Sequence, residues 1–411
     1  MRDGSAPTHF FGLDIGTSAV RCVVGMFGSD DSNQLSIIGH GIAPNIGMRK
    51  GMVIHIDDVA EAVSHAVAEA ERISGVAINQ ATVNINGVHV SGLNSKGVVA
   101  ISAANREISN DDRYRAEEAA TIMQLPPNRE IVQVFATNYR VDGQDNIKNP
   151  VGMSGVRLEV DTHIVTASSP FLKNLTTTLE KAGMLANHLT VSSLAAAEAV
   201  LNRQQKESGT VLLDIGAGTT NLVVVEDGEI QHVAVIPIGG INITNDLAIG
   251  LKTDLDIAEK VKIKHASLET PNYDSVKVEV DGKEHSFAKT EIHMITEARV
   301  DELFDYVEKE LKRIGRSRKL PGGVVMVGGT SQLPGLADFA KEKLQLAART
   351  GSLHSLQGLV DVIDDPAYIT AIGLMELDML LSPESQTHSR GAPNMKALGL
   401  IEGLLRRLRK K

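Results

Sequence analysis

Two short segments contain the residue types that hold phosphate in proteins. DIGTS at residues 14–18 and DIGAGTT at residues 214–220 begin 200 positions apart, and each lies between two apolar runs. A strand that ends at Asp-x-Gly and returns through Thr or Ser is a hairpin, and the backbone N–H groups at its tip can hold a phosphate. The carboxylates of Asp14 and Asp214 can each hold a divalent cation through water. Two such hairpins predict two related lobes that close on one nucleotide.

Three further segments could contribute to a nucleotide site. Gly328-Gly329 follows an apolar run and precedes a helical pattern, which allows a base or sugar to approach the backbone closely. Gly239-Gly240 ends another apolar run, and Glu198 falls in a helical pattern between the two hairpins. Each segment also has an ordinary structural explanation, because Gly-Gly is usually a loop and a helical Glu is usually solvated. Their order along the chain is what favours a site.

The elements that must position these residues repeat in the two halves of the chain. Residues 10–53 predict three strands, and a helix with apolar residues at helical spacing follows and ends at Gly75. The second half repeats this order with a hairpin at 211–225, a strand at 229–238 and a helix from 242. This similarity predicts an α/β fold in which a β-β-β-α unit is duplicated.

Other segments predict elements outside the repeat. Helices are predicted at 111–123, 171–182, 193–205, 255–268, 292–314, 337–346 and 368–381, and strands at 81–90, 130–141, 157–167 and 322–327. Residues 276–287 predict a charged hairpin, and residues 382–394 are polar with Pro and Gly, which predicts a flexible linker. A coil of that length spans about 20 Å.

Composition excludes several classes of protein. The chain has 411 residues, a net charge of −10 and only 3% aromatic residues with no Trp, which argues against a generic nucleic-acid binder. Cys22 is the only cysteine, so no intramolecular disulfide can form and a reducing cytosol fits best. The 13 His are scattered without zinc-ligand spacing. We find no signal-peptide pattern in residues 1–7 and no apolar run long enough to span a membrane.

The last 17 residues differ from the rest of the chain. Residues 395–411 carry a net charge of +5, so the remainder carries −15. On a helix, an apolar face within an arc of roughly 160° contains Leu398, Leu400, Ile401, Leu404, Leu405 and Leu408. The opposite face contains Arg406, Arg407, Arg409 and Lys410. This pattern predicts a basic amphipathic helix that lies in the interface of an anionic membrane. Docking on a protein core or on a partner helix, and binding of nucleic acid, are the alternatives.

The order of these segments resembles the actin–Hsp70–sugar kinase superfamily. Its phosphate 1, connect 1, phosphate 2, adenosine and connect 2 motifs match residues 13–21, 191–201, 212–225, 325–336 and 369–377. The superfamily implies two lobes, built on duplicated ribonuclease H-like domains, with ATP and Mg²⁺ between them. Hinge motion opens and closes such a cleft.

Within that superfamily, nearly the whole chain resembles the FtsA family of bacterial cell-division proteins. The most specific matches are PNREI at 127–131, YRVDG at 139–143, IKNPVGM at 147–153 and RLEV at 157–160, in an inserted subdomain that actin and Hsp70 lack. Ala19, Gln133 and Asn221 depart from the family pattern, where Lys, His and Asp are usual. Arg21 lies two residues after Ala19, hence on the same strand face, and would supply the missing cation.

The resemblance implies roles for individual residues. Asp14 and Asp214 would organise Mg²⁺ through water, and Glu198, with Asp214, would act on a hydrolytic water if hydrolysis occurs. The implied nucleotide-binding residues are Asp14, Gly16, Thr17, Ser18, Arg21, Asp214, Gly216, Ala217, Gly218, Thr219, Thr220, Gly239, Gly240, Glu259, Lys262, Gly328, Gly329 and Ser331. We expect ATP binding with weak or no turnover, below about 1 s⁻¹.

The resemblance also implies a domain organisation. The first-lobe core (1A) would comprise 8–86 and 163–205, the inserted subdomain (1C) 87–162, the second-lobe core (2A) 206–244 and 320–381, and the small second-lobe subdomain (2B) 245–319. The linker at 382–394 would then lead to the amphipathic helix at 395–411.

The function that the resemblance implies is membrane tethering during cell division. The protein would self-associate into actin-like filaments and bind the C-terminal peptide of FtsZ through residues 245–319. It would recruit FtsZ to the cytoplasmic face of the membrane at the septum, through the tail, and later division proteins could join. A pilus-type actin-like platform protein is the first alternative, and a sugar or acid kinase on the same fold is the second.

Overall fold

The computed structural model describes residues 9–27, 35–102, 105–270, 274–280, 282–353, 356–359 and 364–382. The first lobe contains a six-stranded sheet in the order β11-β6-β1-β2-β3-β19. Its strands are β1 (His9–Ile15), β2 (Ala19–Phe27), β3 (Leu35–Pro44), β6 (Gln80–Ile85), β11 (Leu185–Val191) and β19 (Gln357–Gly358). β1, β2 and β3 form an antiparallel meander, and β6 pairs in parallel with both β1 and β11.

The second lobe repeats this topology in a five-stranded sheet with the order β14-β13-β12-β17-β18. Its strands are β12 (Thr210–Ile215), β13 (Thr220–Glu226), β14 (Glu229–Ile236), β17 (Gly323–Val327) and β18 (Ala348–Thr350). Again three strands form an antiparallel meander, and parallel strands extend the sheet from the first of them. The register also repeats, because Asp14 pairs with Arg21 and Asp214 pairs with Asn221. The predicted duplication is therefore confirmed.

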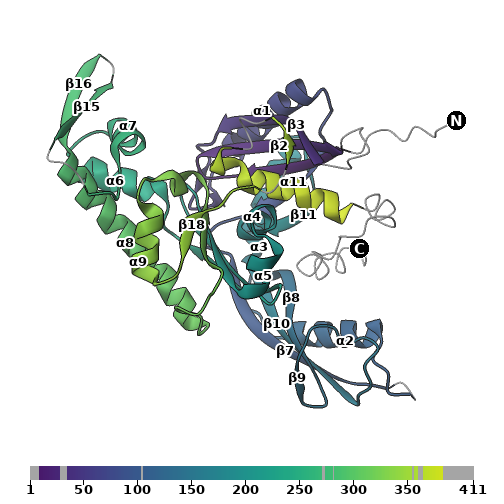
Figure 1. Ribbon diagram of the computed structural model, residues 1–411. Helices are drawn as coiled ribbons and strands as arrows, with labels where there is room; N and C mark the ends of the chain where they lie inside the picture. The colour runs from purple at the N-terminus through teal and green to yellow at the C-terminus, as the bar shows by residue number, and fades with distance from the viewer. Residues whose placement is uncertain are drawn as a thin grey trace.

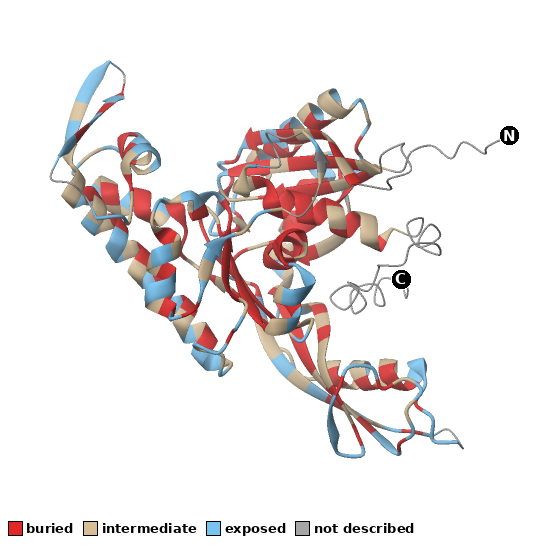
Figure 2. Cartoon of the chain, viewed as in Figure 1, coloured by how far each residue is buried: buried red, intermediate tan, exposed pale blue. Residues whose placement is uncertain are grey.

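Two helices join the lobes where they meet. α4 (Ser192–Val200) and α11 (Ile369–Leu381) lie side by side in the middle of the molecule (Figure 1) and are almost wholly buried (Figure 2). They pack so closely that a Cβ on Gly373 would lie 1.9 Å from the carbonyl oxygen of Ala195. Only glycine fits at that crossing.

One predicted helix is divided in the structure. Residues 193–205 were expected to form a single helix, but α4 ends at Val200 and α5 (Arg203–Ser208) begins after an extended Leu201. The cause is local: the side chain of Asn202 accepts from the N–H of Gln205, and the side chain of Gln205 accepts from the N–H of Asn202. This capping box starts a new helix.

A third sheet extends from the first lobe, at the lower right of Figure 1. Its order is β7-β10-β8-β9, with β7 (Ser91–Ala100), β8 (Arg129–Val141), β9 (Gln144–Ile147) and β10 (Arg157–Ser168). Helix α2 (Asn110–Thr121) packs on β7, where a Cβ on Gly97 would lie 1.9 Å from the carbonyl oxygen of Ala116. A small apolar cluster that includes Leu158 and Ala116 forms a separate core.

The remaining helices, hairpins and 3₁₀ turns belong to the two lobes, and the β15–β16 hairpin projects beyond α7 and α8 at the upper left of Figure 1. On the first lobe these are β4 (Met48–Arg49), β5 (Met52–Val53), α1 (Ile56–Ser74) and α3 (Ser169–Lys181). On the second lobe they are α6 (Gly240–Gly250), α7 (Leu255–His265), β15 (Ser275–Val280), β16 (Lys283–Ala288), α8 (Lys289–Arg313), the 3₁₀ turn η1 (Gly329–Gln332) and α9 (Leu336–Leu344). A second 3₁₀ turn, η2 (Pro366–Tyr368), contacts both lobes. Gly75 ends α1 with φ 73°, as predicted. Among the described helices, none is long and apolar enough to cross a bilayer.

Candidate nucleotide-binding site

The two Asp-Ile-Gly turns have the same geometry and meet across the lobes. The N–H of Gly16 donates to the carbonyl of Ala19 at 3.1 Å, and the N–H of Gly216 donates to the carbonyl of Thr219 at 2.9 Å. A Cβ on Gly218 would lie 2.8 Å from the hydroxyl oxygen of Thr17, so the tip of one turn touches the tip of the other.

A cavity of about 490 Å³ opens beside this contact and is lined by both lobes. Most of the sequence-predicted nucleotide residues line it together: Asp14, Gly16, Thr17, Ser18, Arg21, Asp214, Gly216, Ala217, Gly218, Thr219, Gly240, Glu259, Lys262, Gly328 and Gly329. A volume of this size is typical of a small-molecule site.

Asp14 is a buried carboxylate at the first-lobe side of the cavity. Its Oδ1 accepts from the side-chain amide of Asn84 at 2.6 Å. Burial raises the pKa of Asp14 to about 7, Arg21 opposes this rise, and the charge of Asp214 adds to it. The two carboxylates therefore repel each other in a poorly solvated place, which is an arrangement that a cation would stabilise.

Asp214 is the equivalent carboxylate at the second-lobe side. Its Oδ2 accepts from Asn221 at 3.3 Å and from Thr370 at 3.4 Å. Burial raises the pKa of Asp214, while these two hydrogen bonds and the charge of Arg21 lower it. Gly328 lies against this carboxylate with φ 85°, and a Cβ there would be 2.6 Å from Oδ1. Both its conformation and its position therefore require glycine.

Lys262 organises the second-lobe wall. Its ammonium donates to both carboxylate oxygens of Glu259 at 2.6 and 2.8 Å, to the hydroxyl of Thr244 at 2.9 Å and to the carbonyl of Gly240 at 3.3 Å. These contacts join α7 to the start of α6. They hold Glu259 and Lys262 at the cavity edge, where they can meet hydroxyl groups of a ligand.

Four predicted residues do not line the cavity. Thr220, Gly239 and Ser331 shape its walls: the hydroxyls of Thr220 and Ser331 donate to the carbonyls of Ile238 and Gly328, and Gly239 caps the start of α6. The carboxylate of Glu198 instead forms a largely buried ion pair with Lys206 at 2.8 Å. The structure thus does not bring Glu198 to the cavity.

Sequence reasoning missed several residues that line the cavity or support its carboxylates. Asn84 and Asn86 lie at the carboxyl end of β6 and just beyond it, beside β1, which is where ligands bind in parallel sheets. Thr330 lines the wall and donates to the carbonyl of Gly216 at 3.1 Å. Thr370 lies in the segment matched to connect 2, yet its contact with Asp214 depends on the tertiary fold and has no local signal.

The three residues that depart from the family pattern are each accommodated by their neighbours in the structure. Ala19 is buried, and Asn221 donates to Asp214. Gln133 donates to the hydroxyl of Thr190 at 2.9 Å, so it links the third sheet to β11 of the first lobe.

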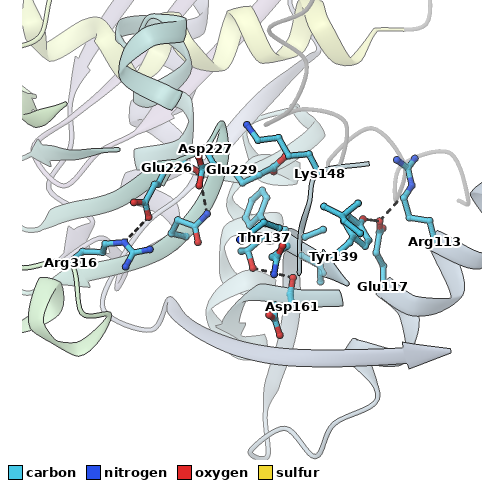
Figure 3. Close-up of a pocket in the computed structure, with 17 residues that line it drawn as sticks. Arg113, Glu117, Thr137, Tyr139, Lys148, Asp161, Glu226, Asp227, Glu229 and Arg316 are labelled. Atoms are coloured by element: carbon cyan, nitrogen blue, oxygen red, sulfur yellow. Dashed lines mark hydrogen bonds and ion pairs between the residues drawn. The ribbon is translucent and has the colours of Figure 1, made fainter. Parts of the chain in front are cut away.

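A second cavity of about 640 Å³ lies between the third sheet and the second lobe (Figure 3). On its walls Arg316 donates to Glu226 at 2.6 Å, and the hydroxyl of Tyr139 donates to Glu117 at 2.5 Å. These pairs lie on opposite sides of the cavity. The Arg316–Glu226 pair is on the second lobe, and the Tyr139–Glu117 pair is on the third sheet and its helix α2.

The predicted membrane-binding residues all belong to the segment 395–411. Residues 395–411 and most of the predicted linker lie outside the described residues.

Comparison with solved structures defines the class of protein. The chain matches a PilM–PilN type IV pilus biogenesis complex with TM-score 0.63 and 17% identity, over 90% of this chain and 98% of the other. It matches MreB5 of Spiroplasma citri bound to ADP with TM-score 0.54 and 14% identity, over 93% and 99%. A MamK double helical filament matches with TM-score 0.50 and 13% identity, over 90% and 98%. The fold is therefore actin-like, with two lobes and an inserted subdomain.

Sequence comparison identifies the family. The chain is 37% identical to the cell division protein FtsA of Pseudomonas aeruginosa, over 89% of this chain and 88% of the relative. It is 37% identical to that of Bacillus subtilis and 31% identical to that of Escherichia coli, covering 82% and 89% of those relatives. A family model described as cell division protein FtsA matches residues 211–373, and one described as the SHS2 domain inserted in FtsA matches residues 87–166. The chain belongs to the FtsA family of cell-division proteins.

Proposed function

We propose that this protein is an ATP-binding, actin-like cell-division protein. The observation that carries the nucleotide assignment is the convergence of both Asp-Ile-Gly turns, one from each lobe, on one cavity. Backbone N–H groups at the two tips would provide donors for phosphate oxygens from both sides. The structural neighbour MreB5, which was solved with ADP, supports the same assignment.

The carboxylates fit a magnesium ion bound with the nucleotide. Asp14 and Asp214 are buried and face the same cavity, and the charge of Asp214 adds to the rise in the pKa of Asp14. Carboxylate oxygens suit Mg²⁺, which keeps much of its water and also binds nucleotide phosphates. Asp14 and Asp214 would hold the hydrated ion, which would neutralise phosphate charge. On the second lobe, Gly328 and Gly329 would line the adenosine, and Glu259 with Lys262 the ribose.

The site supports binding better than turnover. Glu198 is ion-paired with Lys206 and is not among the residues that line the cavity. The nucleotide then acts as a clamp that sets the angle between the lobes, and hydrolysis is slow or absent.

Family membership supports a role as a membrane tether for FtsZ at the division septum. The basic amphipathic pattern at 395–411 would bind the cytoplasmic face of an anionic membrane, and residues 245–319 would bind the C-terminal peptide of FtsZ. Filament assembly is supported by the likeness to MamK, solved as a double helical filament.

Within the predicted FtsZ-binding region, Arg299 donates to both carboxylate oxygens of Asp246, at 2.5 and 2.9 Å, so its charge is already neutralised inside the protein.

Vesicle co-sedimentation tests this tethering role. Purified protein and FtsZ are mixed with anionic vesicles, with and without ATP, and a form that lacks residues 395–411 is the control. We expect FtsZ to sediment only with the full-length protein. Sedimentation of FtsZ with the truncated form, or with neither form, would contradict the proposal.

The pilus-type alternative is not favoured. The pilus complex shares the fold at 17% identity, whereas the FtsA relatives share 31–37% identity over most of the chain.

A further inference from the structure

The ring of Tyr368 lies against the guanidinium of Arg21. The Cζ atom of Arg21 is 5.4 Å from the ring centroid. The ring is buried and is supported from another side by His40, edge-on at 6.0 Å. An arginine that stacks on a fixed aromatic ring samples fewer side-chain conformations.

Arg21 is the cation that faces both carboxylates of the cavity. It is the cross-strand partner of Asp14, and its charge lowers the pKa of Asp14 and of Asp214 against the effect of burial. Its Nε atom is buried and makes no hydrogen bond to any described residue. The stack therefore holds Arg21 in place and leaves hydrogen-bonding capacity for an anion.

The segment that contains Tyr368 also touches the second lobe. Two residues later, Thr370 donates to Asp214 at 3.4 Å, and two residues earlier the carbonyl of Pro366 accepts from the N–H of Gly328 at 3.2 Å. The ring thus reaches Arg21 from a segment that is fixed to the second turn and to the Gly328 loop.

We propose that Tyr368 is a positioning residue, which aims Arg21 at the terminal phosphate of a nucleoside triphosphate and so makes the site distinguish ATP from ADP. The inference rests on the proposed nucleotide site. Glu259 and Lys262 come from α7 of the second lobe, whereas Arg21 comes from β2 of the first lobe beside both carboxylates. In this pose, with the sugar at α7, the last phosphate of a triphosphate would lie at Arg21 at the other side of the same cavity, and a diphosphate would end one phosphate short of it.

The test compares ATP and ADP affinity in full-length protein by competition with a fluorescent nucleotide. Tyr368→Leu removes the ring and Tyr368→Phe keeps it. We expect Tyr368→Leu to weaken ATP binding about fivefold to tenfold and ADP binding less than twofold, while Tyr368→Phe matches the wild type. Arg21→Ala should remove the same preference for ATP, and the double variant Arg21→Ala/Tyr368→Leu should lose no more than Arg21→Ala alone.

Several outcomes overturn the inference. Equal losses for ATP and ADP in Tyr368→Leu would assign the ring a structural role only. A Tyr368→Phe variant as weak as Tyr368→Leu, or additive losses in the double variant, would also exclude positioning through the stack. Arg21→Ala keeps the ring, so an unchanged ratio of ATP to ADP affinity in this variant would overturn the inference even if Tyr368→Leu does not fold. Failure of the wild type to bind either nucleotide would reject the proposed function as well.

Discussion

The hydroxyl of Thr17 occupies the space that a side chain on Gly218 would need. These residues belong to the tips of the two phosphate-type turns, and a Cβ on Gly218 would be 2.8 Å from Oγ1 and 2.9 Å from Cγ2 of Thr17. The contact joins the two lobes at the mouth of the cavity. The size of the residues at these two positions therefore limits how closely the lobes approach each other.

Gly218→Ala should keep the lobes slightly apart. We expect ATP affinity to fall at least tenfold, because in the proposed site both tips contact the phosphates only when the lobes are close. Thr17→Ala in the same chain removes both crowded atoms and should recover part of the affinity. Competition titrations measure this, and no loss in Gly218→Ala would show that the contact does not limit closure.

The crossing of α4 and α11 should tolerate no side chain at Gly373. A Cβ there meets backbone at 1.9 Å, so Gly373→Ala must separate the helices and should lower the free energy of unfolding by about 2 kcal/mol or more. Gly250→Ala is a matched control, because its Cβ would meet only the flexible end of Ile295. Denaturant unfolding of both variants checks this, and similar losses would contradict the packing argument.

Asn84 should be required for both the fold and the site. Its amide donates to Asp14 at 2.6 Å and to Ser192 at 3.1 Å, and its carbonyl oxygen accepts from the N–H of Ile15 at 2.8 Å. Asn84→Ala leaves buried groups without these partners, so we expect a loss of about 2–3 kcal/mol in the free energy of unfolding. Asn187→Ala, which loses a 3.3 Å bond to Asp378, should cost less. Equal losses in the two variants would contradict the importance of Asn84.

Glu376 should make stability depend on pH. Burial and the nearby Glu198 raise its pKa from 4.5 to about 8, against the effect of Lys206. Between these two values the folded state holds a proton that the unfolded state has lost, so its contribution to stability falls as pH rises from 4.5 to 8. We expect Glu376→Gln to be more stable than the wild type at pH 9, by at most about 5 kcal/mol, and similar to it near pH 4. Thermal unfolding of both proteins between pH 4 and pH 9 measures this. A difference in stability that does not change with pH would contradict the prediction.

The local pattern of the chain was enough to predict the two hairpins, their strands and most helices. DIGTS and DIGAGTT carry a turn signal within each segment, and the apolar runs beside them predict buried strands. The division between α4 and α5 has a local signal too, the capping box of Asn202 and Gln205, but helical spacing on both sides conceals it.

The contacts that complete the site depend on tertiary structure. Thr370 is 156 residues from Asp214, and Tyr368 meets Arg21 only because α11 returns to the first lobe. No spacing in the sequence predicts these pairs. Glu198 shows the reverse case, because its motif position predicted a residue of the nucleotide site, whereas its carboxylate pairs with Lys206 and does not line the cavity.

Binding of Mg²⁺–ATP by the purified protein tests the central claim most directly. Isothermal titration of the wild type, with and without EDTA, is compared with Asp14→Asn and Asp214→Asn. We predict saturable binding at one site, at least tenfold weaker when Mg²⁺ is removed or when either carboxylate is replaced. No binding by the wild type, or equal binding by all three proteins, would contradict the assignment of this cavity as the nucleotide site.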